Sequence, residues 1–290
     1  MTTLRQQLIQ ELVLRGLAER TQEAYIDQVY HLAKYYHRPP DTLTEEEVRD
    51  YLVYLAQERH WAASSINQAV NAFRFFYQHV GHRDLAVLRQ ALPFGRKAIV
   101  RAQVFSIAQL ETLFTVGCVH PRDRAFLMTV YGGGLRLNEA CHLQLADLHG
   151  SRHQIRVVQG KGKKDRYTLL SPRLLAELRL YWKMFRVDGW LFPSPHDAQQ
   201  PMIDGTGQRI FYRAVQRAGL PRQGGIHSLR HSFATHLLES GVEITVVQRL
   251  LGHASLATTA GYLHVRQERL GQIKSPLQLL DLSPVVAAKG

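Results

Sequence analysis

The chain has few of the features that mark secreted, disulfide-bonded or membrane proteins. Only two cysteines occur among its 290 residues, Cys118 and Cys141. They form neither a metal-type pair nor a disulfide framework, so each is expected to be a structural thiol in a reducing compartment. No run approaches the roughly 18 apolar residues of a membrane span, and the charged N-terminal stretch lacks the apolar core of a signal peptide. We therefore expect a soluble, cytoplasmic protein with no membrane partner.

The chain also has fewer acidic than basic residues. Lysine and arginine number 36 against 24 aspartates and glutamates, which gives a formal net charge of +12 and a pI near 9.9. Charged residues make up 21% of the chain, so the excess is an imbalance of sign and not an unusual density of charge. A polyanionic partner, nucleic acid, is the simplest explanation, with a generically basic protein as the alternative. The length favours two domains.

The first part of the chain, residues 1–81, is predicted to be a small helical bundle. Apolar residues recur at helical spacing over Thr21–Tyr36, and the two prolines at 39 and 40 end that helix. Two capping boxes predict the starts of further helices, Thr44 with Glu47 and Ser65 with Gln68.

The stretch 82–103 loses this periodicity and is rich in basic residues, with Asp84 as its single acid. We interpret it as an interdomain linker that passes close to phosphates, the alternative being an ordinary solvated linker. A capping box of Ser106 with Gln109 restarts helical structure, so the second domain is expected over 104–272, followed by a tail over 273–290.

One β-hairpin interrupts the helical second domain. Residues 154–159 and 166–170 have strand character, and the basic segment 160–165 between them contains two glycines and three lysines. A phosphate-binding Walker loop would need Gly-Lys followed by Ser or Thr at the start of a helix, and neither condition is met.

Near the C-terminus, a tyrosine follows residues suited to phosphate chemistry. Tyr262 is a poor nucleophile while its phenol keeps its proton, because the ordinary pKa of tyrosine is about 10. It would need a neighbouring base and cations around the phosphate. His227 and Arg230, three residues apart, share one face of a predicted helix, and His253 follows in the phrase L-G-H. A zinc site at His227 and the histidine four residues on is the competing interpretation, but zinc proteases of that pattern carry glutamate after the first histidine.

Two more basic residues complete the candidate set. The run Y-G-G-G-L-R-L-N-E-A at 131–140 predicts a tight glycine turn before a helix, capped by Asn138 or a neighbour, with Arg136 at its N-terminus. Lys161 lies on the tip of the predicted hairpin, where a lysine surrounded by cations could donate a proton. Alternatively, the hairpin lysines contact only DNA backbone.

Taken in order, these residues resemble the active-site set of the tyrosine recombinases, also called the phage integrase family. The set consists of Arg136, Lys161, His227, Arg230, His253 and Tyr262. It lies in register within the phrases H-S-L-R-H-S-F-A-T-H-L-L-E-S-G and V-V-Q-R-L-L-G-H. The stretch L-A-E-R-T-Q-E-A-Y at 17–25 is similar to the start of the family's SAM-like core-binding domain. The resemblance implies a mainly α fold with a small β-hairpin, in two domains that form a C-shaped clamp on duplex DNA.

The resemblance also implies a mechanism. Tyr262 would attack the scissile phosphate and form a 3′-phosphotyrosyl bond, while Arg136 and Arg230 hold the non-bridging oxygens. His227 would assist as base or hydrogen-bond partner, His253 would steady the phosphate, and the hairpin lysine would protonate the departing 5′-oxygen. Neither metal, ATP nor any other cofactor is required, and exchange of this type uses four protomers.

Some features depart from the family or leave alternatives open. Gly261 and Leu263 flank the tyrosine where a bulkier and a smaller or polar residue are expected, so the tyrosine could settle into place only on DNA. The tail 273–290 resembles a segment that packs on a neighbouring protomer, and a loosely docked end is the alternative. A compact Xer-like or transposon-encoded type fits best. The rival functions are a type IB topoisomerase and a non-catalytic regulator whose helix-turn-helix spans 244–262.

Overall fold

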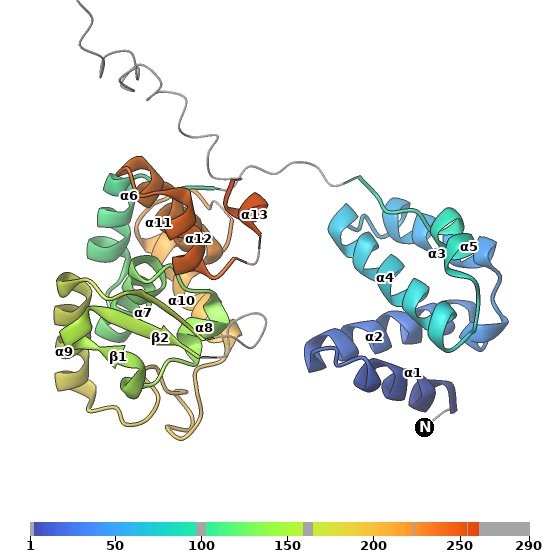
Figure 1. Cartoon of the computed structure of the whole chain (residues 1–290), viewed down its shortest axis with the longest axis horizontal. Helices are drawn as coiled ribbons and strands as arrows, with labels where there is room; N and C mark the ends of the chain where they lie inside the picture. Colours follow the sequence, from blue (N-terminus) through green and yellow to red (C-terminus); the bar gives the residue numbers. More distant parts are fainter. Residues whose placement is uncertain (1–2, 97–102, 159–164, 223, 254, 261–290) are drawn as a thin grey trace, which may run out of the picture. The chain divides into compact units, whose positions relative to one another are not determined.

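A computed structural model describes residues 3–96, 103–158, 165–222, 224–253 and 255–260. The chain divides into two compact units, Met1–Val100 and Arg101–Gly290, and each is described by itself (Figure 1). Helices dominate both units, and one small antiparallel sheet lies in the second. The predicted fold class, mainly α with a small sheet, is confirmed.

The first unit is a bundle of five α-helices and one short 3₁₀ helix over its described residues. They are α1 (Thr3–Leu14), α2 (Glu19–Tyr36), η1 (Pro40–Thr42), α3 (Glu45–Gln57), α4 (Ala63–His79) and α5 (Leu85–Ala91). Helix α4 is central, because Phe73 and Tyr77 are fully buried among residues of α2 and α3. The buried Tyr77 hydroxyl donates a 2.6 Å hydrogen bond to the carbonyl oxygen of Pro40, which satisfies both polar groups.

Two of the three predicted capping boxes form. At the start of α3, the Glu47 N–H donates to the Thr44 hydroxyl at 3.2 Å and the Thr44 N–H donates to the Glu47 carboxylate at 2.8 Å. Ser106 and Gln109 make the same reciprocal pair at 3.2 and 2.9 Å, at the start of α6. These side chains satisfy amide groups that the first turn of a helix leaves unpaired.

The third predicted box is wrong. Helix α4 begins at Ala63, two residues before Ser65, and its N-cap Ala62 makes no side-chain capping bond. The Ser65 N–H donates to the Ala62 carbonyl at 2.9 Å, so Ser65 already belongs to the first helical turn. The S-x-x-Q spacing alone did not locate the start of the helix.

Part of the expected linker belongs to the helical unit. Helix α5 buries Leu88, and Leu92 just after it is also fully buried in the same core. Further along, the side chain of Asn67 exchanges hydrogen bonds of 2.8 and 3.0 Å with the backbone of Gly95. Seven helical residues give too short a pattern for a periodicity argument, which explains why the sequence suggested an aperiodic segment.

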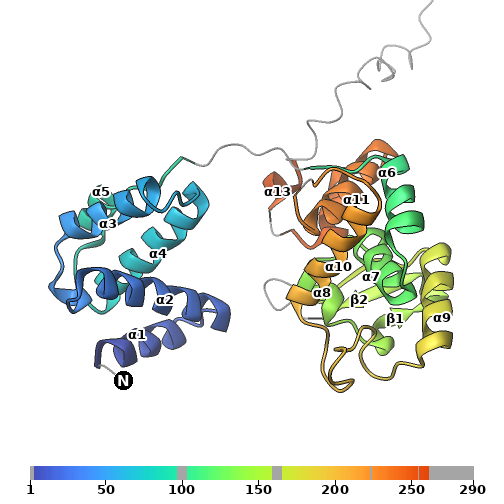
Figure 2. The ribbon, with the colours of Figure 1, turned by 180° about the vertical axis from the view of Figure 1, so that it is seen from behind.

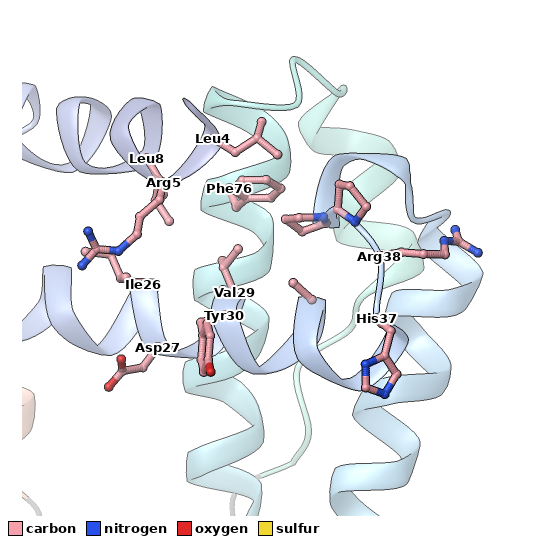
Figure 3. A pocket seen from close by; sticks show the side chains of 13 residues that line it. Leu4, Arg5, Leu8, Ile26, Asp27, Val29, Tyr30, His37, Arg38 and Phe76 are labelled. Carbon is pink, nitrogen blue, oxygen red and sulfur yellow. The ribbon is translucent and has the colours of Figure 1, made fainter. Parts of the chain in front are cut away.

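An apolar pocket of about 590 Å³ lies within the first unit, between α1, α2 and α4. Figure 3 shows the apolar side chains around it, which include Leu4, Leu8, Ile26, Val29 and Phe76. Arg5, Asp27 and Arg38 add charged groups to its lining. None of the predicted site residues that the structure describes lines this pocket.

The second unit holds the remaining described elements. They are α6 (Ile107–Thr112), the π-helical turn η2 (Leu113–Gly117), α7 (Pro121–Gly132), α8 (Leu137–Cys141), η3 (Leu145–Asp147), β1 (Leu148–His149), η4 (Gly150–Arg152), β2 (Gln154–Val157), β3 (Arg166–Leu169), α9 (Pro172–Phe185), α10 (Asp204–Arg217), α11 (His227–Glu239), α12 (Ile244–Leu251) and α13 (Leu256–Ala260). Helix α7 contacts both α9 and α11, and α9 lies beside the sheet (Figures 1 and 2).

The predicted hairpin is present, with shorter strands than expected. Strand β2 pairs antiparallel with β3, from Gln154 opposite Leu169 to Val157 opposite Arg166. The unpredicted two-residue strand β1 extends the sheet on the other side of β2. The segment 159–164, which contains Lys161, lies outside the described residues.

Two further expectations concern cysteines and membranes. Both cysteines are free and buried, and burial raises the pKa of each thiol to about 12, in keeping with structural roles. Among the described residues, no helix has the length and apolar character needed to cross a bilayer.

Candidate active site

The glycine turn places Arg136 at the N-terminus of α8. Gly134 adopts a left-handed backbone with φ of 59°, and a side chain there would overlap the ring of Phe233 on α11. Arg136 itself is the N-cap residue, and its N–H donates to the Glu139 carboxylate at 2.8 Å. Of the caps left open by the sequence, Asn138 or a neighbour, Asn138 lies exposed within the helix and Arg136, two residues earlier, holds the N-cap position.

Arg230 lies deeply buried on α11, with 4% of its surface exposed. Its guanidinium donates to the carbonyl oxygens of Gly134 and Leu251, each at 2.6 Å. These two carbonyls follow α7 and end α12, so the arginine ties both segments to α11. A guanidinium suits this task because its donors are planar and its charge persists at all relevant pH values.

A carboxylate that the sequence did not single out joins the arginines. Glu139 is 8% exposed and accepts hydrogen bonds of 2.7 Å from Arg136 and from Arg166 on β3, with Arg230 3.7 Å away. Burial alone would raise the pKa of Glu139, but hydrogen bonds and charge from Arg166, with hydrogen bonds from Arg136, lower it to about 2. We call these four residues the arginine–glutamate cluster.

Arg166 connects this cluster to the end of α12. Its two terminal nitrogens each donate to a different oxygen of Glu139 at 2.7 Å, and its Nε donates to the Leu250 carbonyl at 2.9 Å. The left-handed Gly252, with φ of 64°, packs on the same side chain, since a Cβ there would lie 2.6 Å from Arg166 Cδ. The R-x-x-E spacing could have signalled Glu139, whereas nothing local in the sequence marks Arg166.

His253 follows that glycine in the turn between α12 and α13. Its Nδ1 lies 2.9 Å from the buried Thr259 hydroxyl, and its carbonyl accepts a 3.1 Å bond from Gln248. Desolvation, followed by the charges of Arg230 and Arg136, lowers the pKa of His253 to about 4. The imidazole is therefore neutral at physiological pH and acts as a hydrogen-bonding group.

His227 begins α11 and completes the described part of the site. The residue is exposed to solvent, yet desolvation of the part that packs on protein lowers the pKa of its imidazole. The positive charges of Arg230 and Arg136 lower this pKa further. Four predicted residues, Arg136, His227, Arg230 and His253, thus share one electrostatic environment. Lys161 and Tyr262 lie outside the described residues, as do Gly261, Leu263 and the tail 273–290.

Comparison with known proteins assigns the chain to a family. The sequence profile of the Phage integrase family matches residues 103–269, and that of the phage integrase N-terminal SAM-like domain matches residues 4–87. The chain belongs to the phage integrase family.

Relatives extend over nearly the whole chain. The integrase/recombinase-like protein y4qK of Sinorhizobium fredii is 40% identical over 97% of this chain and 90% of its own length. Tyrosine recombinase XerA of Pyrococcus furiosus is 30% identical over 96% of each chain. Among solved structures, a lambda integrase bound to a COC' core site shares the fold with a TM-score of 0.71 and 18% identity, over 95% of this chain and 98% of that one. The chain is a tyrosine recombinase, an enzyme of site-specific recombination.

Family membership separates this recombinase from the alternatives. Helices α12 and α13 with the turn at Gly252 do have the order of a helix-turn-helix. In this phage integrase, however, that turn carries the carbonyls bound by Arg230 and Arg136, at 2.6 and 3.4 Å. The comparisons favour neither a non-catalytic regulator nor a type IB topoisomerase.

The two histidines considered as zinc ligands, His227 and His231, lie close to a positively charged arginine. His231 follows His227 by one helical turn on α11, and desolvation followed by the charges of His227 and Arg230 lowers its pKa. Over the part of the chain that the structure describes, no group of three or more histidines, cysteines or carboxylates could hold a metal ion.

Proposed function

We propose that this recombinase cuts and rejoins duplex DNA with Tyr262 as nucleophile and Arg136, Lys161, His227, Arg230 and His253 as its partners. The observation that carries the proposal is the convergence of two arginines and two histidines from three segments of the chain. Arg136, for example, reaches the carbonyl of Gly252, 116 residues later in the sequence, at 3.4 Å. Such a cationic, partly desolvated site suits a phosphate that gains charge in its transition state.

In the proposed reaction, the Tyr262 oxygen attacks the scissile phosphorus while the bond from phosphorus to the 5′-oxygen breaks. His227 takes or shares the phenol proton, which its lowered pKa permits because the ring is neutral at physiological pH. Lys161 gives a proton to the leaving 5′-oxygen. A 5′-hydroxyl from the partner strand then reverses these steps, so the phosphate ester is conserved without metal or nucleotide cofactor.

Arg136 and Arg230 bind the non-bridging oxygens in this proposal. Both side chains are oriented before any phosphate arrives, by Glu139 and by backbone carbonyls. Preorganised donors stabilise a transition state more than donors that must first reorient. The neutral His253 adds a hydrogen bond to the phosphate.

The partners and organisation of the enzyme belong to the same proposal. The net charge of +12 supports double-stranded DNA as the substrate, and solved structures of similar fold include a Tn1549 transposon integrase in complex with circular intermediate DNA. We propose that the first helical unit, with helix α5 included, and residues 104–272 act as the two arms of a C-shaped clamp on DNA. Four protomers would assemble on DNA, with the tail 273–290 exchanged between them, in the cytoplasm.

The test is a nicked suicide duplex that carries the recombination site and traps the covalent intermediate. An adduct is expected with the wild-type enzyme and should disappear in Tyr262→Phe while DNA binding persists. Tyr212→Phe is the matched control, because hydrogen bonds from Gln208 and Arg222 lower the pKa of Tyr212. Among the described tyrosines it is the single one with a lowered pKa. An adduct that survives Tyr262→Phe, or that depends on Tyr212, would contradict the assignment.

A further inference from the structure

Arg166 differs from Arg136 in how its donors are used. Its side chain is 10% exposed, both terminal nitrogens bind Glu139, and its Nε binds the Leu250 carbonyl. Arg136, by contrast, is 26% exposed and makes a single 2.7 Å side-chain bond to the same carboxylate. Arg166 is thus oriented toward protein groups, whereas Arg136 remains accessible to a ligand.

The charges of the cluster show what Arg166 contributes. Arg136, Arg166 and Arg230 bring three positive charges against the one negative charge of Glu139, which leaves a net charge of +2. Without Arg166 the net charge would be +1, and Glu139 would hold the remaining guanidiniums more strongly. A phosphate would then have to compete for Arg136 with a Glu139 carboxylate that no longer binds Arg166 through both oxygens.

We infer that Arg166 is a positioning residue for strand cleavage: it neutralises Glu139 and so leaves Arg136 available to the scissile phosphate. This inference rests on the proposed role of Arg136. Arg166 also fixes the turn that carries His253, through the Leu250 carbonyl and its contact with Gly252. One side chain on β3 therefore sets the geometry of two segments that bind phosphate.

The experiment uses two suicide duplexes, one with a normal scissile phosphate and one with a neutral methylphosphonate at that position. Cleavage is measured at saturating enzyme, so that differences in DNA affinity do not enter. On the phosphate, Arg166→Met should form the Tyr262 adduct roughly 100-fold more slowly than wild type, within the range for loss of a transition-state donor. On the methylphosphonate, which needs less charge neutralisation, Arg166→Met should be less than about 10-fold slower than wild type.

Two further variants separate positioning from folding. Arg166→Lys keeps the charge but cannot bridge both carboxylate oxygens, so it should fold and show a smaller deficit that also shrinks on the methylphosphonate. Arg156→Met is the matched control, because Arg156 lies on the neighbouring strand and pairs with Asp165 at the surface, at 2.8 Å. It should cleave both duplexes at rates within about twofold of wild type, as expected for an exposed ion pair.

The outcomes distinguish this inference from the proposed function. Absence of a Tyr262 adduct with the wild-type enzyme would contradict the proposed function itself. With that adduct present, wild-type rates in Arg166→Lys and Arg166→Met would overturn the positioning role. An equal deficit on both duplexes would also overturn it, because a general loss of structure does not depend on the charge of the phosphate.

Discussion

Arg230 donates a 2.6 Å hydrogen bond to the carbonyl oxygen of Gly134, which precedes it by 96 residues. The contact is possible because Gly134 has no side chain and its turn packs directly on Phe233 of α11. The left-handed backbone at Gly134 aims that carbonyl at the guanidinium. The glycine turn and α11 therefore act as one support for the proposed phosphate site.

Replacing that glycine should damage both stability and cleavage. In Gly134→Ala, the methyl group would overlap the Phe233 ring and the backbone would be strained, so the free energy of unfolding should fall by about 2–4 kcal/mol. Gly219→Ala is the control, because Gly219 has a similar φ of 63° but no atom lies within 4 Å of the position that a Cβ would take there. Denaturant unfolding should show a loss of only about 1 kcal/mol for that variant. Equal losses in both variants would contradict the close-packing argument.

Substitution of Arg230 by lysine tests the geometry of its guanidinium and not merely its charge. A lysine at 230 could not bind the Gly134 and Leu251 carbonyls together, as the guanidinium does at 2.6 Å each. Arg230→Lys should reduce formation of the covalent adduct by at least about 100-fold. The exposed Arg179→Lys on α9 provides the comparison and should retain wild-type rates on the suicide duplex. Normal cleavage by Arg230→Lys would argue against the proposed phosphate-binding role.

Glu139 is expected to be the residue of the cluster whose loss costs most stability. Glu139→Gln keeps the shape but removes the charge that compensates Arg166 and Arg136, each bound at 2.7 Å. Breaking a buried ion pair from one side costs about 3–5 kcal/mol. Thermal unfolding should therefore show a lower midpoint than wild type, and Glu46→Gln, on the exposed first turn of α3, should leave it unchanged. A midpoint unaffected by Glu139→Gln would show that the cluster is not stabilised by this charge.

The lowered pKa of His253 predicts a pH dependence of stability. Its pKa is about 4 in the folded protein, against about 6.5 in the unfolded chain. Between these values the unfolded state binds the extra proton, so stability should fall as the pH is lowered from 6.5 to 4, and this contribution should level off below 4. For one such group, the free energy of unfolding changes with pH by at most about 1.4 kcal/mol per pH unit. His227, His231 and His236 add to this slope, because their pKa values are also lowered.

Denaturant unfolding of wild type and His253→Gln between pH 4 and 7.5 tests this expectation. The variant should lose part of the pH dependence, and its stability relative to wild type should improve as the pH falls. Glu139, with a folded pKa of about 2 against an ordinary value of about 4.5, adds to the fall only near the acidic end of this range, and it does so equally in both proteins. A wild-type slope in the variant would mean that His253 titrates normally in the folded protein.

Much of the fold follows from short-range patterns. The capping boxes at Thr44 and Ser106 and the hairpin of β2 and β3 were predicted from spacing and composition, since each depends on neighbours a few residues away. The box at Ser65 was wrong because an S-x-x-Q pattern also fits inside a helix that begins earlier. Helix α5 was missed because its stability comes from burying Leu88 in the bundle core, which a seven-residue pattern does not reveal.

The sequence by itself determined the order and identity of the candidate residues, and with them the family. Arginine, histidine and tyrosine have chemical properties that do not depend on the fold, and their order could be read directly. Only the tertiary structure decided that Arg166 joins this set and binds Glu139, because its hydrogen bonds link strand β3 to α8 and α12. A buried ion pair joins segments that come together only in the folded protein. Its free energy depends on the desolvation and the charges at that contact, which no local sequence pattern encodes.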